Sequence, residues 1–374
     1  MRRAILAGLD ARSFLCRHWQ KRPLVARQAL PRYETLVTRE ALFELAVRDD
    51  VPSRLVTRSG RRWNVAHGPF SRRALARLPR RGWTLLVQGV NQVLPAAQSL
   101  LLEFDFIPYA RLDDVMVSYA PPGGGVGPHF DSYDVFLLQL AGTRRWRVSG
   151  QCDLALIENA PLKLLRRFRP EREWRLAPGD MLYLPPQVAH DGIAVDECLT
   201  ASIGFRAPGA QELAARFLEF LQDELALAGA YRDPDLRPAQ RPAQIGSGML
   251  RQVAHTLDRI DWDKRDVLAF LGQYLTEPKA HVVFQRPARP LSAAMFARRA
   301  RRSGVRLDLK TQMLFRGRSV FVNGERHEVG ARAAQLLTKL ADHRRLMPPL
   351  ALEGEAAERL YQWYRAGYIV ADAT

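Results

Sequence analysis

Apolar and polar residues alternate in short stretches through the first half of the chain, and this pattern predicts β-strands. The alternating stretches are 113–120, 132–140 and 144–149, and the continuous apolar stretch 83–91 predicts a buried strand. Residues 52–66 are predicted to form a strand, a turn and a strand, and 172–184 and 198–205 supply further strands. Helical spacing predicts helices at 9–20, at 38–48 with Thr38 as N-cap, and at 95–104. So many short strands in one region favour a jelly roll, or double-stranded β-helix, whose mouth can hold one small cosubstrate.

After Pro208 the apolar residues take helical spacing instead. A first helix is predicted at 209–229, a proline-rich connector at 232–248, and two more helices from Met249 to Ile260 and from Val267 to Leu275. Three helices with broad apolar faces need a partner surface. This surface is either a second protein chain or the jelly roll, which the helices would then cover as a simple layer.

The last part of the chain combines helices with a small hairpin. Helices are predicted at 292–302, 331–342 and 355–366, and Asn323-Gly324 between alternating residues is a strong hairpin signal. The expected fold class is therefore α+β with three domains: the jelly roll at 1–208, a helical region at 209–290, and a winged-helix-like domain at 291–374.

A metal-binding pattern stands where a glycine-rich loop precedes the strand predicted at 132–140. His129 and Asp131 lie two residues apart, so in an extended segment both side chains point to the same side. His190, expected in a loop after Pro185-Pro186, is the best third ligand. Two imidazoles and one carboxylate leave the opposite positions open, which suits Fe(II) or Mn(II) better than structural zinc.

A His-x-Asp pair alone also occurs in surface turns, so a second signal is needed. Arg144, in the motif GTRRW, supplies it, because a guanidinium can bind a carboxylate through two parallel hydrogen bonds. The four glycines at 123, 124, 125 and 127 allow a ligand or a backbone to approach closely. No Gly-Lys-Ser/Thr follows them, so a phosphate-binding loop is excluded and we expect them to shape the mouth of the pocket.

Five motifs in order resemble the JmjC-type 2-oxoglutarate oxygenases. They are HWQKRPLV, GGGVGPHFDSYDVFLLQ, GTRRWRV, LAPGDMLYLPP with the following His190, and SIGFRAP, and they span residues 18–208. The match is closest to the bacterial ribosomal oxygenases, which resemble cupin-fold arginine hydroxylases of the large-subunit ribosomal protein L sixteen. Many JmjC enzymes have lysine where this chain has Arg144, which favours the ribosomal branch.

The resemblance implies a function for each site residue. His129, Asp131 and His190 would bind Fe(II), Arg144 would bind the distal carboxylate of the cosubstrate 2-oxoglutarate, and O2 would be the oxidant. The resemblance also implies a dimerisation module after the jelly roll, hence a homodimer, and a winged-helix domain at the end of the chain. The substrate would be a ribosomal protein.

Further polar residues near these motifs are candidates for binding. An arginine substrate needs acceptors near the pocket mouth, and Asp113, Asp114 and Asp134 are close in sequence, but the sequence does not choose among them. Ser118 and Tyr133 are candidates for cosubstrate binding, and Ser202 is a candidate for substrate binding.

Composition limits the partners and the compartment. The 374 residues are 47% apolar and carry a formal net charge of +17. Such a charge favours phosphate-rich partners such as ribosomal RNA, which Arg298, Arg299, Arg301 and Arg302 could contact, although arginine-rich sequences also arise from GC-rich genomes. Cys16, Cys152 and Cys198 are far apart and indicate a reducing compartment. No 18 apolar residues run together, so we expect a cytoplasmic protein without a membrane span.

Three functions remain open on the sequence. The first is an arginine hydroxylase of a ribosomal protein, and the second is a histidyl hydroxylase of another ribosomal protein. The third is a non-enzymatic cupin that acts as a ribosome-binding or assembly factor. The triad together with Arg144 argues against the third, because a pure binding module needs none of these four residues.

Overall fold

The computed structural model describes residues 5–60 and 62–372 and divides into two compact units. One unit contains the chain up to Ala207, residues 278–311 and the chain from Gln335 onward; the other contains 208–277 and 312–334. The domain boundaries expected at 208 and 290 stay predictions. Among the described residues, no helix is both long and apolar enough to cross a membrane.

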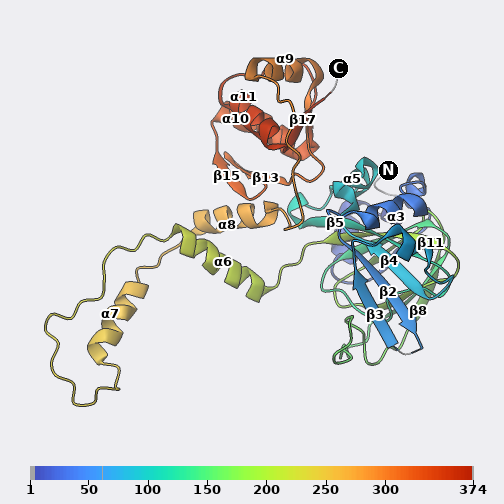
Figure 1. The fold of residues 1–374 in the computed structure, drawn as a ribbon, viewed down its shortest axis with the longest axis horizontal. Coiled ribbons are helices and arrows are strands. Elements are labelled where there is room, and N and C mark those ends of the chain that lie inside the picture. Colours follow the sequence, from blue (N-terminus) through green and yellow to red (C-terminus); the bar gives the residue numbers. More distant parts are fainter. Residues whose placement is uncertain (1–4, 61, 373–374) are drawn as a thin grey trace. The chain divides into compact units, whose positions relative to one another are not determined.

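Two antiparallel sheets build the expected jelly roll (Figure 1). The larger sheet has the order β1-β9-β6-β11-β5-β4-β2-β3 and the smaller one β10-β7-β8. The larger sheet contains β1 (Leu24–Ala26), β2 (Ser53–Ser59), β3 (Arg62–His67), β4 (Trp83–Val87), β5 (Leu112–Ala120), β6 (Val135–Ala141), β9 (Met181–Leu184) and β11 (Cys198–Phe205). The smaller contains β7 (Arg144–Ser149), β8 (Arg172–Leu176) and β10 (Ala189–Ala194).

Strand β6 shows how the sequence pattern becomes two apolar layers. Its side chains alternate between the faces of the sheet. Val135 and Leu137 pack with Trp146 in the cluster formed by both sheets, whereas Phe136 and Leu138 belong to the main core on the other side. Both faces of β6 are therefore buried, which explains its continuous apolar sequence.

The main core packs helices against the large sheet. The helices are α2 (Ala11–Arg17), α3 (Arg39–Val47), α4 (Arg72–Ala76) and α5 (Pro95–Leu102). Phe14 of α2 lies against Phe136 and Tyr183 of the sheet, with ring centroids 5.6 and 5.1 Å apart. Thr38 caps α3 as expected, because its side chain accepts the N–H of Ala41 at 3.2 Å. These helices stabilise the sheet from the side away from the smaller sheet.

The second unit contains the three expected helices and a β-meander. Its elements are α6 (Ala210–Glu224), α7 (Ser247–Leu257), α8 (Lys264–Thr276), β13 (Met313–Arg316), β14 (Ser319–Val322) and β15 (Glu325–Glu328). Helix α6 ends at Glu224, so the helix expected at 209–229 is shorter than predicted. The hairpin is confirmed: Asn323 and Gly324 have φ of 51° and 87°, as a two-residue turn between paired strands requires.

The remaining elements of the first unit follow α8 in sequence. They are α9 (Ala293–Ser303), β12 (Val305–Leu307), α10 (Ala331–His343), β16 (Arg345–Leu346), α11 (Gly354–Ala366) and β17 (Ile369–Ala371), with α10 belonging to the first unit from Gln335 onward. Strands β16, β12 and β17 form a small antiparallel sheet, and Phe296 of α9 stacks on Tyr364 of α11. This mixture of helices and short strands is the one expected at the end of the chain.

Candidate metal and cosubstrate site

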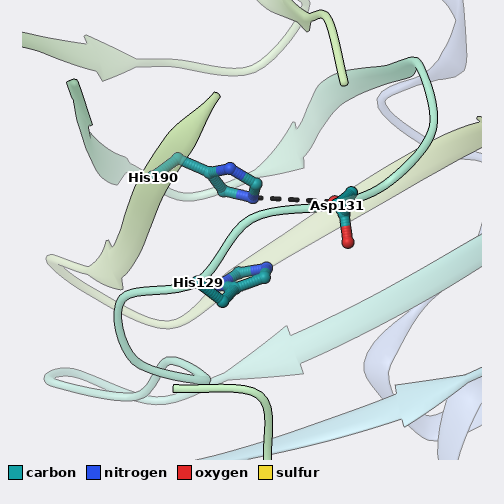
Figure 2. A group of neighbouring side chains, drawn as sticks. All are labelled: His129, Asp131 and His190. Carbon is teal, nitrogen blue, oxygen red and sulfur yellow. Dashed lines mark ion pairs between the residues drawn. The ribbon is translucent and has the colours of Figure 1, made fainter. Parts of the chain in front are cut away.

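His129, Asp131 and His190 converge in the first unit, as Figure 2 shows. One ligand atom from each lies within 4.8 Å of the others. The surrounding backbone differs from the sequence expectation. His190 lies in strand β10 and not in a loop, whereas His129 and Asp131 lie in an irregular segment before β6. The expected convergence nevertheless holds, because the backbones of the two histidines pair with each other.

A pair of backbone hydrogen bonds fixes the two imidazoles. The N–H of His129 donates to the carbonyl of His190 at 2.9 Å, and the N–H of His190 donates back at 2.8 Å. The ring centroids consequently lie only 4.2 Å apart. The loop and the strand thus act as one rigid support for both histidines.

Each imidazole is also held in one tautomer. Nδ1 of His129 lies 2.8 Å from the carbonyl oxygen of Gly127, and Nδ1 of His190 lies 2.9 Å from that of Val188. A carbonyl can only accept, so both Nδ1 atoms carry the proton and both Nε2 atoms keep a lone pair. Backbone partners of this kind orient histidine ligands in metal sites.

Electrostatics also keep His190 ready to bind a cation. Burial, and then the neighbouring His129, lower the pKa of His190 to about 4, so its imidazole is neutral at pH 7. Its Nε2 lies 3.7 Å from Oδ2 of Asp131. Two imidazoles and one carboxylate, without a thiolate, fit the donor set of Fe(II) or Mn(II).

Arg144 lies in the same cavity, which has a volume of about 560 Å³ and is lined by residues of both sheets. Its side chain is only 5% exposed, and Nε has no hydrogen-bond partner among the described residues. One terminal nitrogen lies 3.6 Å from Sγ of Cys198, and the guanidinium carbon lies 5.7 Å from the ring centroid of Trp146. A buried cation with an unused donor fits a site for a carboxylate.

The glycine loop packs on the protein backbone. A Cβ on Gly125 would lie 2.6 Å from the carbonyl oxygen of Gly192, and one on Gly124 would lie 2.2 Å from that of Trp83. Close backbone approach is thus confirmed for Gly124 and Gly125. A Cβ on Gly123 would meet nothing within 4 Å, and one on Gly127 would meet the side chains of Leu164 and Trp63. The loop fixes the segment that carries His129, and Val126 from the same loop lines the cavity.

The other predicted binding residues divide into two groups. Five line the cavity, namely Asp113, Asp114, Ser118, Tyr133 and Ser202. Asp134 is not among the lining residues of the described chain, because it is fully buried and accepts from the hydroxyl of Tyr183 at 2.6 Å and from the amide of Gln20 at 3.0 Å. Its surroundings therefore give no support to the predicted substrate contact and indicate a structural role.

The two remaining acidic candidates have different partners. Asp113 pairs with Lys279 at 2.9 Å and with Arg206 at 3.7 Å. Asp114 accepts a backbone N–H, that of Gly89 at 3.0 Å, and no side-chain donor of the described residues reaches it. Burial and then the Asp113 carboxylate raise the pKa of Asp114. Asp113 therefore has two cationic partners, whereas the carboxylate of Asp114 has no side-chain ion pair or hydrogen bond among the described residues.

Several polar lining residues far from the metal motif were not found by sequence reasoning. Arg54 lies on β2, Thr84 lies on β4, Gln88 directly follows β4, and Lys279 lies in the segment after α8. None lies near the metal motif in sequence. Only the predicted strands at 52–66 and 83–91 gave a signal, because every second side chain of a strand points to the same face.

Two protein families match parts of this chain. A JmjC domain matches residues 99–213, and a ROXA-like winged helix matches residues 259–369. The ribosomal protein uL16 3-hydroxylase of Escherichia coli is 33% identical over 318 residues, which cover 84% of each chain. A probable ribosomal oxygenase of Haemophilus influenzae is 42% identical over 228 residues, covering 60% of this chain and 54% of that one.

Solved structures agree with these relatives. The X-ray structure of Escherichia coli YcfD matches 97% of this chain and 98% of its own, at 29% identity and a TM-score of 0.85. The structure of YcfD, described as a ribosomal oxygenase, in complex with cobalt and 2-oxoglutarate matches the same shares at 30% identity and a TM-score of 0.80. The likeness extends over almost the whole chain and so includes the winged helix as well as the jelly roll.

Proposed function

Because this chain belongs to the JmjC-domain ribosomal oxygenases, we propose that it is an Fe(II)- and 2-oxoglutarate-dependent hydroxylase of an arginine in ribosomal protein uL16. The observation that carries the proposal is the placement of His129, Asp131 and His190 in one cavity with the buried guanidinium of Arg144. The relative from Escherichia coli supports the substrate, since its name states a uL16 3-hydroxylase.

The protein side of the reaction follows from the site. His129, Asp131 and His190 hold the metal from one side, and Arg144 binds the distal carboxylate of 2-oxoglutarate, with Ser118 and Tyr133 as further hydrogen-bonding groups on the cavity wall. Bound Fe(II) supplies the oxygen chemistry: O2 converts 2-oxoglutarate to succinate and CO2, and one oxygen atom enters a C–H bond of the substrate. The apolar side chains of Met116, Val135, Leu137 and Trp146 line the cavity and limit access of water.

Asp114 is the acceptor that we assign to the substrate guanidinium. Its neighbour Asp113 already pairs with Lys279, while the Asp114 carboxylate is partly buried and lines the cavity together with Tyr133 and Ser202. A guanidinium would form a charge-assisted hydrogen bond with it and would favour its ionised form. A histidine substrate would be neutral at pH 7 and would gain less from this carboxylate.

Mass spectrometry of ribosomal proteins tests this function. We compare cells with the gene, without the gene, and with Asp131→Ala or the control Asp233→Ala, which changes an exposed residue of the connector. We expect one arginine of uL16 to gain a single oxygen with the intact gene and with the control, but not with Asp131→Ala. An added oxygen on a histidine of another protein would establish the alternative substrate, and unchanged ribosomal proteins would refute the ribosomal function.

The helices of the second unit support a homodimer. Exposed apolar side chains lie in α6, in α7 and in the connector between them: Leu218 and Leu250 are 66% and 65% exposed, and Ile245 is 75% exposed. Helices that expose several large apolar side chains favour burial against a partner. Light scattering of the wild type should give twice the chain mass, and Leu250→Glu should reduce it, whereas Arg251→Glu on the same helix should not.

We also propose contact with ribosomal RNA through the basic helix α9. Arg299 and Arg301 donate to carbonyl oxygens of Asp372 and Leu352, at 3.2 and 2.6 Å. Arg298 and Arg302 are exposed and remain the candidates for phosphate contacts. Filter binding of ribosomal RNA by a double Arg298→Ala, Arg302→Ala variant tests this, with weaker and less salt-dependent binding expected.

A further inference from the structure

Seven charged side chains of the described residues line the cavity, and not every one of them has a function in the proposed reaction. They are Arg54, Asp113, Asp114, Asp131, Arg144, Lys163 and Lys279. Asp131 serves the metal, Arg144 the cosubstrate and Asp114 the target guanidinium, while Asp113 and Lys279 pair with each other. Lys163 is exposed to solvent. Arg54 remains as a cavity guanidinium without an assigned function.

Arg54 is positioned by strand pairing. It lies on β2 opposite Leu86 of β4, and Arg54, Val56, Thr84 and Leu86 all line the cavity, so this is the inner face of the two strands. Nε of Arg54 is buried without a hydrogen-bond partner. Within residues 5–60 and 62–372 its guanidinium makes no ion pair or hydrogen bond, not even with Asp113 or Asp114 of the same cavity. A buried donor without an acceptor is unfavourable, and such exceptions are commonly completed by a ligand.

Gln88 gives this region a second polar group. Its backbone N–H donates to the carbonyl of Pro52 at 2.9 Å, so the pairing of the two strands continues beyond β4. This register places Gln88 opposite Pro52 and diagonal to Arg54. The side chain of Gln88 lines the cavity. In the part of the chain that the structure describes, its amide makes no hydrogen bond. Donors of a guanidinium therefore stand beside an amide that can both donate and accept.

We propose that Arg54 and Gln88 form a binding subsite for the main-chain N–H and C=O of one extended substrate residue, next to the residue that is hydroxylated. Arg54 donates to the carbonyl oxygen of this residue, and the side-chain oxygen of Gln88 accepts its N–H. A carboxylate is a poorer match, because it offers only acceptors and would leave the oxygen of Gln88 unused. The inference rests on the proposed protein substrate, and it explains how the enzyme could hold a flexible chain while Asp114 holds one side chain.

The test measures peptide affinity and separate KM values for the peptide and the cosubstrate. The probe is a synthetic peptide of uL16 around the arginine that gains oxygen, titrated into the full chain with Mn(II) and 2-oxoglutarate under nitrogen. We expect Arg54→Ala to raise the Kd and the KM for the peptide about 10- to 100-fold, as loss of a charge-assisted hydrogen bond implies. The KM for the cosubstrate should stay unchanged. Arg58→Ala is the matched control, because Arg58 lies on the same strand, is exposed, and donates to the carbonyl of Gly60 at 2.8 Å.

Amide-to-ester substitution in the peptide identifies the group that is recognised. An ester removes the N–H and weakens the carbonyl acceptor. At one bond beside the target arginine it should weaken binding to the wild type about tenfold and to Gln88→Ala much less. If the Arg54→Ala loss instead disappears when an acidic peptide side chain is replaced by its amide, Arg54 binds a carboxylate and the proposal is wrong.

The remaining outcomes separate the subsite from the enzyme function. If the wild type hydroxylates the peptide, and Arg54→Ala and Arg54→Gln bind the peptide as tightly as the wild type does, only the subsite proposal is overturned. A wild type that neither binds nor hydroxylates any ribosomal peptide overturns the proposed function and the subsite with it. An unchanged circular dichroism spectrum and an unchanged KM for the cosubstrate exclude misfolding as the cause of a loss.

Discussion

Replacing Arg144 by methionine should weaken cosubstrate binding and at the same time stabilise the empty protein. In the structure the guanidinium is 5% exposed, and its Nε has no partner among the described residues. A buried donor without an acceptor costs about 1–3 kcal/mol. An apolar side chain of similar length removes this cost, so Arg144→Met should raise the free energy of unfolding of the cosubstrate-free chain by roughly this amount.

The effect on cosubstrate affinity has the opposite sign. Each charge-assisted hydrogen bond that is lost is worth about 1.5–3 kcal/mol, and 1.4 kcal/mol is about tenfold in Kd. The Kd for the cosubstrate should therefore rise at least about 10- to 100-fold. At a concentration about 100 times the wild-type Kd, 2-oxoglutarate stabilises the wild type by about 2.7 kcal/mol, but a variant with about 100-fold weaker binding by only about 0.4 kcal/mol.

Urea unfolding with and without 2-oxoglutarate, in the presence of Mn(II), measures both effects. Arg145→Met is the control, because the neighbouring side chain points to the other face of β7 and its guanidinium lies 3.7 Å from Glu173. If Arg144→Met destabilises the empty chain and leaves the Kd for the cosubstrate unchanged, Arg144 is a structural residue and the cosubstrate assignment is refuted.

Three further predictions concern the same cavity. The folded-state pKa of His190, about 4, lies below the unfolded value of 6.5, so the stability present above pH 6.5 should fall by about 3 kcal/mol towards pH 4 in the metal-free chain. Urea unfolding of wild type and His190→Gln at both pH values checks this. An equal loss of stability in both proteins would contradict it. Asp114→Asn should raise the KM for the peptide about 10- to 100-fold. It should cause no loss of stability, because the raised pKa of Asp114 means that the charge of this carboxylate is unfavourable in the folded chain. Steady-state kinetics and urea unfolding measure the two effects, and equal KM values for wild type and variant would remove Asp114 from the substrate site. His129→Ala should abolish stoichiometric binding of Fe(II) or Mn(II) in an anaerobic titration, whereas His255→Ala on α7 should bind one ion per chain like the wild type.

Local sequence patterns were sufficient for most elements and for the pair His129 and Asp131. The N-cap Thr38 and the Asn323-Gly324 turn depend on neighbouring residues only, and each appears in the structure as predicted. The strand expected at 132–140 appears as β6, but both of its faces are buried instead of alternating between core and solvent. His129 and Asp131 are two residues apart, so any extended backbone brings their side chains to one side. Arg144 could be found for a similar reason, because it follows the metal motif by one strand and one turn.

Tertiary structure decided which other polar groups belong to the site. Asp113, Asp114 and Asp134 look alike in the sequence. In the structure, Asp113 pairs with Lys279, and Asp134 is buried and accepts from the hydroxyl of Tyr183. Asp114 lines the cavity, and its side-chain counterions are more distant than that of Asp113. The backbone bridge between His129 and His190 and the cavity positions of Arg54 and Gln88 also depend on strands that are distant in sequence. Alternation shows which residues share a face of a strand, whereas the order of strands in the sheet decides what that face meets. This order is fixed by pairing between segments far apart in the chain, and so the sequence alone did not reveal it.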